Sequence, residues 1–167
     1  MTRFHLAQVN IGRVRAPLDD PSMEGFRTQL GPINALADST PGFVWRLQTE
    51  DGHAMAIRPF EDERMAINLS VWESLGALQQ FVYRSAHVAP LGDRKQWFEP
   101  MEGPILALWW IPIGHVPTVE EAKERLRHLA ERGPSAHAFT FRTPFPPPGG
   151  DAVAISGLDA RFCEWAT

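Results

Sequence analysis

The sequence predicts an α+β fold in which an antiparallel sheet carries its helices on one face. Three observations lead to this fold class. First, four short stretches have the residue pattern of strands, at 4–11, 43–48, 67–72 and 105–113. Second, apolar residues recur at helical spacing between the first and second of these stretches, and again between the third and fourth. Third, a chain of 167 residues, 44% hydrophobic and 22% charged, suits one domain with a single core.

The first strand and the first helix follow from short patterns near the start of the chain. Residues 4–11 alternate between two faces, which is the period of a strand. Pro21 suits the first turn of a helix capped by Asp20 or Ser22. The apolar residues of this helix are Met23, Phe26, Leu30, Ile33 and Leu36. Gly31-Pro32 interrupts the run, and because proline has no N–H group we expect a kink or two short helices.

The second and third strands are separated by a turn at Asp51-Gly52 and a long connection at residues 53–65. The third strand, residues 67–72, alternates apolar residues with polar or aromatic ones. A helix follows it, with a start near Glu73 or Ser74 and an end marked by Pro90 and Gly92. Its apolar residues are Leu75, Leu78, Phe81 and Val82.

The fourth strand, residues 105–113 (ILALWWIPI), is almost wholly apolar, so we expect burial on both faces. After it, Thr118 and Glu121 fit a capping box, and Gly133-Pro134 ends the helix that they begin. The expected buried residues of this helix are Val119, Ala122, Leu126 and Leu129. His128 falls on its exposed side. Residues 138–142 (AFTFR) predict a short fifth strand.

This order of strands and helices is the ferredoxin-like split βαβ arrangement, with one helix and one strand added. We expect a domain at residues 1–143, followed at 144–167 by a Pro/Gly-rich linker and a tail whose Phe162 and Trp165 dock on the body or on a partner. The open face of such a sheet needs a cover, and the usual cover is a second copy of the chain. The sequence therefore predicts a homodimer.

Composition excludes several function classes. A net charge of -4 with scattered basic residues argues against nucleic acid binding. The single cysteine, Cys163, excludes an internal disulfide, and the histidines show no metal-ligand spacing. No stretch has the pattern of a signal peptide or a membrane span, so we expect a soluble, cytoplasmic protein with no membrane partner. There is no glycine-rich phosphate loop and no hydrolase Gly-x-Ser-x-Gly elbow.

A cluster of polar and aromatic residues follows the apolar face of the second helix. His87 is a candidate acid, base or iron ligand, although a histidine at a helix end is also stabilised by the helix dipole. Arg84 suits a substrate carboxylate, or equally a salt bridge to Glu73 or Asp93. Candidate pocket walls, each with core packing as its alternative, are Trp72, Trp97, Trp45, Tyr83 and Phe98. Asn10 is a further candidate, with backbone hydrogen bonding as the alternative.

The stretches Val71-Trp72-Glu73-Ser74 and Ser85-Ala86-His87 resemble the dimeric α/β-barrel superfamily, which includes antibiotic-biosynthesis-type and heme-degrading monooxygenases. More narrowly, the chain to about residue 146 is similar to the family labelled DUF3291. The stretches that carry this resemblance are 68–74 (NLSVWES), 81–87 (FVYRSAH), 94–98 (RKQWF) and 108–112 (LWWIP). The superfamily also contains isomerases and cyclases, so the fold does not determine the reaction.

The resemblance to the heme-degrading members assigns roles to three residues. It implies His87 as the iron ligand, Trp72 as the residue that distorts the heme and Asn10 as the partner of bound oxygen. We therefore expect a small dimeric enzyme, monooxygenase-like, that acts on an apolar or aromatic small molecule, with either heme or no cofactor. The alternatives are a binding protein for heme or a metabolite without turnover, and a cofactor-free isomerase or cyclase in which His87 moves a proton.

Overall fold

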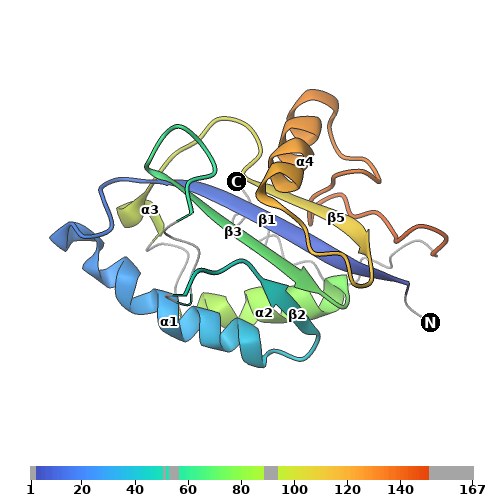
Figure 1. Ribbon diagram of the computed structural model, residues 1–167, viewed down its shortest axis with the longest axis horizontal. Helices are drawn as coiled ribbons and strands as arrows, with labels where there is room; N and C mark the ends of the chain where they lie inside the picture. Colours follow the sequence, from blue (N-terminus) through green and yellow to red (C-terminus); the bar gives the residue numbers. More distant parts are fainter. Residues whose placement is uncertain (1–2, 51, 53–56, 89–93, 151–167) are drawn as a thin grey trace.

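The protein folds around a five-stranded antiparallel sheet with helices on both faces (Figure 1). This computed structural model describes residues 3–50, 52, 57–88 and 94–150. The strands are β1 (Phe4–Val14), β2 (Phe43–Arg46), β3 (Met65–Trp72), β4 (Phe98–Glu99) and β5 (Leu106–Pro112). The α-helices are α1 (Glu24–Ser39), α2 (Leu75–Val88), α3 (Arg94–Trp97) and α4 (Val119–Arg132), and a short 3-10 helix, η1 (Pro21–Met23), precedes α1. The mixed α+β class and the antiparallel sheet are confirmed.

The long strand β1 lies at the centre of the sheet because it pairs on both sides. On one side it pairs with β3, from Leu6 opposite Trp72 to Arg13 opposite Met65. On its other side β5 pairs with residues 4–10 of β1, and β4 pairs with Arg13 and Val14. Therefore β4 and β5 follow each other along one edge of β1. The segment that joins them, residues 100–105, passes beside Ile11, whose N–H donates to the carbonyl oxygen of Ile105 at 2.8 Å.

Alternation along the strands gives the sheet two faces, of which one carries α1 and α2 (Figure 1). We call this one the α1/α2 face. Leu6 and Trp72 on this face pack against Leu75 and Leu78 of α2 and Ala37 of α1. A second cluster near the start of α1 joins Phe26, Met23 and Val14 to Trp97 and Phe98.

Helix α1 is continuous through Pro32, so the expected division into two helices is wrong. Both Gly31 and Pro32 are exposed, which leaves the carbonyl oxygen of Thr28, which would otherwise accept from residue 32, on the water side. Gly31 also has no Cβ to collide with the proline ring that follows it. A helix can carry proline under these conditions.

The opposite face of the sheet, the α4 face, is covered by α4 of the same chain. Buried side chains of β1, β3 and β5 pack there with Ala122, Leu126 and Leu129 of α4, and none is more than 8% exposed. The helix begins as expected, because the Thr118 hydroxyl accepts from the N–H of Glu121 at 3.1 Å. This face is the one through which we expected two copies to pair. A homodimer of this chain would therefore have to use a different surface.

The segment after α4 returns to the sheet without forming a fifth strand of the expected length. Leu108 and Phe139 make an isolated bridge, with hydrogen bonds of 2.8 and 2.9 Å. The indole of Trp110 then donates to the carbonyl oxygen of Phe145 at 2.8 Å, and the Phe145 ring packs on the core. The start of the expected linker thus lies against the body, whereas the tail with Phe162 and Trp165 lies outside the described residues. In the part of the chain that the structure describes, no helix is long and apolar enough to cross a membrane.

Candidate functional site

On the α1/α2 face, paired residues of β1 and β3 form rows across the two strands. These rows become more polar from Leu6 toward Asn10. The first row is apolar and contains Leu6 and Trp72. The next row is polar and buried: the Ser70 hydroxyl donates to Oε1 of Gln8 at 2.8 Å, and the indole N–H of Trp72 donates to Ser70 Oγ at 2.9 Å. This network satisfies the polar atoms that the sheet buries. It also fixes the orientation of Trp72.

Trp72 is a core residue. Its side chain is 0% exposed, stacks on Phe81 at a ring-centroid distance of 5.1 Å and meets Phe43 edge-on at 5.4 Å. The indole therefore presents no surface to a ligand. The heme arrangement implied by the resemblance needs this ring beside the macrocycle, so the described residues do not fit that arrangement.

One row further along the α1/α2 face, Asn10 of β1 lies opposite Asn68 of β3. We call this pair the asparagine patch. The side-chain amide of Asn10 donates to the carbonyl oxygen of Ile105 at 3.3 Å. Asn68 is exposed, although β1 pairs with it and its neighbours Ile67 and Leu69 are buried, because the β2 ladder on the other side of β3 ends at Ser70. Solvent therefore reaches this face beside the end of β2.

Helix α1, which covers this face, has apolar residues that are only half-buried. Phe26, Leu30, Ile33 and Ala37 follow one another at helical spacing along one stripe. Its two ends pack on the body, Phe26 in the Trp97 cluster and Ala37 beside Trp72. Between them, Leu30 and Ile33 stay half-buried. Leu30 and Ile33 thus offer partly accessible apolar surface on a helix that covers this face of the sheet (Figure 1).

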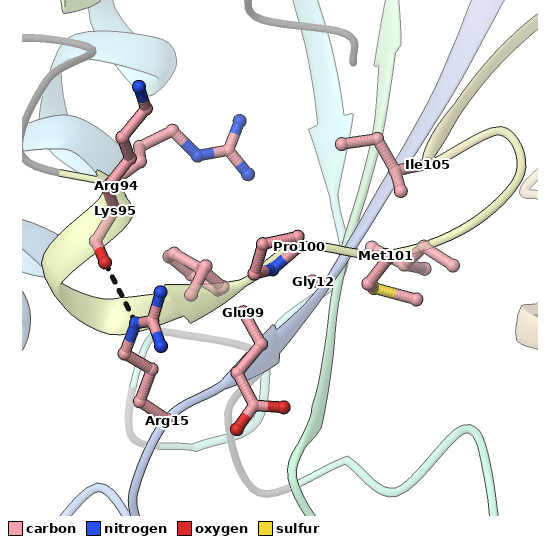
Figure 2. A pocket seen from close by; sticks show the side chains of 10 residues that line it. Gly12, Arg15, Arg94, Lys95, Glu99, Pro100, Met101 and Ile105 are labelled. Carbon is pink, nitrogen blue, oxygen red and sulfur yellow. Dashed lines mark hydrogen bonds between the residues drawn. The ribbon is translucent and has the colours of Figure 1, made fainter.

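A pocket of about 320 Å³ lies next to this layer, at the edge of the sheet where β4 ends and β5 has not yet begun (Figure 2). We call it the edge pocket. Its lining residues are Ile11, Gly12, Arg15, Arg94, Lys95, Phe98, Glu99, Pro100, Met101 and Ile105. The lining combines hydrocarbon surface with three cationic side chains and one carboxylate. Ile105 connects it to the asparagine patch, because its carbonyl oxygen accepts from Asn10.

The close approach of Phe98 to β1 shapes one wall of the edge pocket. A Cβ atom at position 12 would lie 2.6 Å from Cδ1 of Phe98, which is too short for any contact between carbon atoms. Gly12 therefore lets the ring lie directly on the strand. The ring meets Phe26 edge-on at 5.2 Å, and the guanidinium of Arg94 lies over it, 5.2 Å from its centroid. Phe98 is thus held between α1, β1 and α3.

Charges in and beside the edge pocket are divided between its two sides. The Glu99 carboxylate is paired with Arg13, which also binds Asp62, and the hydrogen bond from Arg13 lowers the pKa of Asp62. On the other side, Arg15 Nε donates to the backbone oxygen of Lys95 at 2.8 Å. Burial lowers the pKa of Arg94, which remains cationic at neutral pH. Figure 2 shows the Arg94 and Glu99 side chains on opposite sides of Pro100.

The structure brings only part of the sequence-predicted site together. Phe98 lines the edge pocket and Asn10 adjoins it, whereas Trp97 is buried beneath α1 and 7% exposed. Trp45 packs on the α4 face, so the sheet separates it from Asn10. Of the α2 candidates, Tyr83 is 58% exposed, Arg84 is exposed, and the side chain of His87 lies outside the described part of the structure.

The sequence interpretation missed Asn68 and Arg15 as candidates. Strand alternation alone could have identified Asn68, because an amide on the inner face of a central strand needs either a hydrogen-bond partner or water. The sequence could not have identified Arg15, since its place at the pocket depends on how β4 pairs with β1. No group of three or more histidine, cysteine or carboxylate side chains suited to a metal ion occurs among the described residues.

Fold and site define a small α+β protein with a ligand-sized pocket at the edge of its sheet. The family model described as "Domain of unknown function (DUF3291)" matches residues 5–155, so the chain belongs to this family. No curated protein matches the sequence. Among solved structures, the chain is similar to SnoaB, a cofactor-independent oxygenase from Streptomyces nogalater, in an asparagine-to-alanine variant. The match has 12% identity and a TM-score of 0.41, and covers 67% of this chain and 95% of SnoaB. At these values the similarity says nothing about the reaction.

Proposed function

We propose that this protein is a small monooxygenase-like enzyme that binds an apolar or aromatic molecule between the sheet and helices α1 and α2. One observation carries the proposal: two amides, the half-buried Asn10 and the exposed Asn68, lie side by side on the sheet face that α1 and α2 cover. Ligand sites commonly combine a few placed polar groups with surrounding apolar surface. The half-buried Leu30 and Ile33 of α1 supply apolar surface in the same layer.

The two amides suit an oxygen-bearing aromatic substrate. An amide N–H group donates to a phenolate or enolate oxygen, and such donors stabilise negative charge best where water is partly excluded. In this proposal the electrons that reduce oxygen come from the substrate, because the sequence has neither a flavin nor a nicotinamide motif. His87 at the end of α2 is the proposed base that ionises the substrate, and Arg84 on the same helix is its proposed anion partner.

Oxygen uptake with a panel of naphthols and hydroquinones tests the proposal. We expect at least one to raise the melting temperature of the protein and to be consumed together with oxygen. Asn68→Ala should abolish the uptake without lowering the melting temperature of the free protein, because its side chain is exposed. Asn34→Ala is the matched control, since Asn34 lies on the flank of α1 and donates to the carbonyl oxygen of Gly52 at 3.4 Å.

Two outcomes contradict the enzyme proposal. Binding without oxygen uptake would leave a metabolite-binding protein, and equal loss in Asn68→Ala and Asn34→Ala would remove the asparagine patch from the mechanism. His87→Gln, assayed across pH, tests the base separately: we expect the acidic limb of the pH profile to disappear. An unchanged profile would exclude His87.

The homodimer remains a separate proposal, based on the resemblance to the dimeric α/β-barrel superfamily. Because α4 covers the sheet face expected at the interface, the proposal now needs an interface formed by other surfaces. Light scattering of the purified protein tests it directly. A mass of 18.7 kDa at micromolar concentration would refute the dimer.

A further inference from the structure

We propose that the edge pocket is a binding site for a small apolar carboxylic acid, with Arg94 as the residue that binds the carboxylate. This proposal requires binding only, so it stands or falls independently of oxygenation at the asparagine patch.

The pocket exists because two strands share one edge of β1 without meeting. The β5 ladder ends at Asn10 opposite Leu106, and the β4 ladder begins at Arg13 opposite Glu99. Ile11 and Gly12 lie between the two ladders, and residues 100–105 pass around this point. The resulting volume of about 320 Å³ lies at the lower end of the range for small-molecule sites, roughly 300–1,000 Å³.

The lining matches the two parts of an apolar acid. Phe98, Met101 and Ile105 offer hydrocarbon surface to its body. Arg94 lies over the edge of this surface, and Figure 2 shows its guanidinium extending from α3 toward Ile105. A guanidinium presents paired N–H donors in one plane, which is the geometry of a carboxylate.

The charge balance of the pocket favours an anion. Among the described lining residues three are cationic, and the one carboxylate, Glu99, pairs with Arg13 outside the lining. The pocket is therefore locally positive in a chain whose net charge is -4.

Calorimetric titration of the full chain with 1-naphthoate and with its neutral amide, naphthalene-1-carboxamide, tests the proposal. We expect the acid to bind at least tenfold more tightly than the amide. Arg94→Gln should remove this preference, and Arg94→Lys, which keeps the charge but loses the planar fork, should retain part of it. Arg127→Gln is the matched control, because it removes one exposed cation from α4 and should change nothing.

A second measurement locates the ligand, using proteins with 13C-labelled methionine methyl groups. Met101 lines the edge pocket, whereas Met23 is 1% exposed in the cluster around Trp97. Naphthoate should shift the Met101 resonance through its ring current and leave that of Met23 in place. Equal affinity of acid and amide, equal effects of Arg94→Gln and Arg127→Gln, or a shift at Met23 alone would overturn the proposal. Tighter binding of 1-naphthyl phosphate than of naphthoate would reassign the site to phosphate esters.

Discussion

The two faces of the sheet differ in how they are closed, and the difference separates the parts of the molecule that provide stability from those available for function. On the α4 face, the inner side chains of β1, β3 and β5 are aliphatic apart from Trp109, and α4 seals them. On the α1/α2 face the same strands place Gln8, Ser70, Asn10 and Asn68 inward. Buried amides and hydroxyls contribute less to stability than hydrocarbon of the same size.

Both faces have polar ties between sheet and helix, but they differ in place: on the α1/α2 face Arg46 of β2 pairs with Asp38 near the end of α1, whereas on the α4 face the tie involves a buried indole. The indole of Trp109 donates to Glu121 of α4 at 2.9 Å, and His115 bonds the other oxygen of that carboxylate at 2.7 Å. This network joins the β5–α4 turn, the helix and the sheet. Beside the end of β2, the α1/α2 face is open to water.

The largest expected effect compares two neighbours in β3 that point to opposite faces. Leu69 is 1% exposed on the α4 face, and Asn68 is exposed on the α1/α2 face. Leu69→Ala should lower the free energy of unfolding by about 2–5 kcal/mol because it leaves a cavity in a sealed core. Asn68→Ala should change it by no more than about 0.5 kcal/mol. Urea denaturation measures both, and similar losses in the two variants would show that the α1/α2 face is as closed as the α4 face.

A smaller effect is expected where the edge pocket meets the α1/α2 face. In Gly12→Ala the new methyl group would lie 2.6 Å from the Phe98 ring, so that ring must move. We expect a loss of about 1–3 kcal/mol in unfolding free energy. Gly76→Ala in the first turns of α2 is the control, since the nearest atom is Ser74 Oγ at 3.9 Å. The control should gain up to about 1 kcal/mol, as alanine is the better helix former.

Sequence reasoning predicted the elements that depend on local chemistry. The apolar run at 105–113 gave a strand with Leu108 and Trp109 buried on opposite faces, and Thr118 caps α4 as expected. Sequence reasoning failed where the structure depended on a segment distant in the chain. The alternation of β1 and β3 identifies an apolar face, but not whether α4 or a second chain covers it.

The candidate site was less predictable than the fold. Alternation placed Trp72 on the same face of β3 as Asn68 and Ser70, with a pocket wall and core packing as the alternatives, and only the tertiary packing of Phe81 and Phe43 around it makes it a core residue. Trp97 and Phe98 were expected as pocket walls, and Phe98 lines the edge pocket together with Arg94. That pocket depends on the register of β4, which the sequence of two residues does not specify.

The exposed position predicted for His128 is wrong. The residue is half-buried, and its Nδ1 atom is buried without a hydrogen-bond partner among the described residues.

The smallest expected effect concerns the hydrogen bonds that Glu121 accepts from Trp109 and His115 on the α4 face. The pH dependence of stability tests their contribution. Burial alone would raise the pKa of Glu121, but hydrogen bonds from His115 and Trp109 and the charge of Arg125 outweigh it and lower the pKa. A carboxyl group whose pKa is lower in the folded state contributes stability above its unfolded pKa, about 4.3, and loses that contribution as the pH falls through the folded value. The free energy of unfolding should therefore decline below about pH 4. Glu121→Gln should make this decline shallower and lower the free energy of unfolding by about 1 kcal/mol at pH 7.

Glu120→Gln is the matched control, since the Glu120 side chain is 83% exposed on the same turn. Identical pH profiles for the two variants would mean that Glu121 contributes no more to the closed face than a solvated carboxylate does.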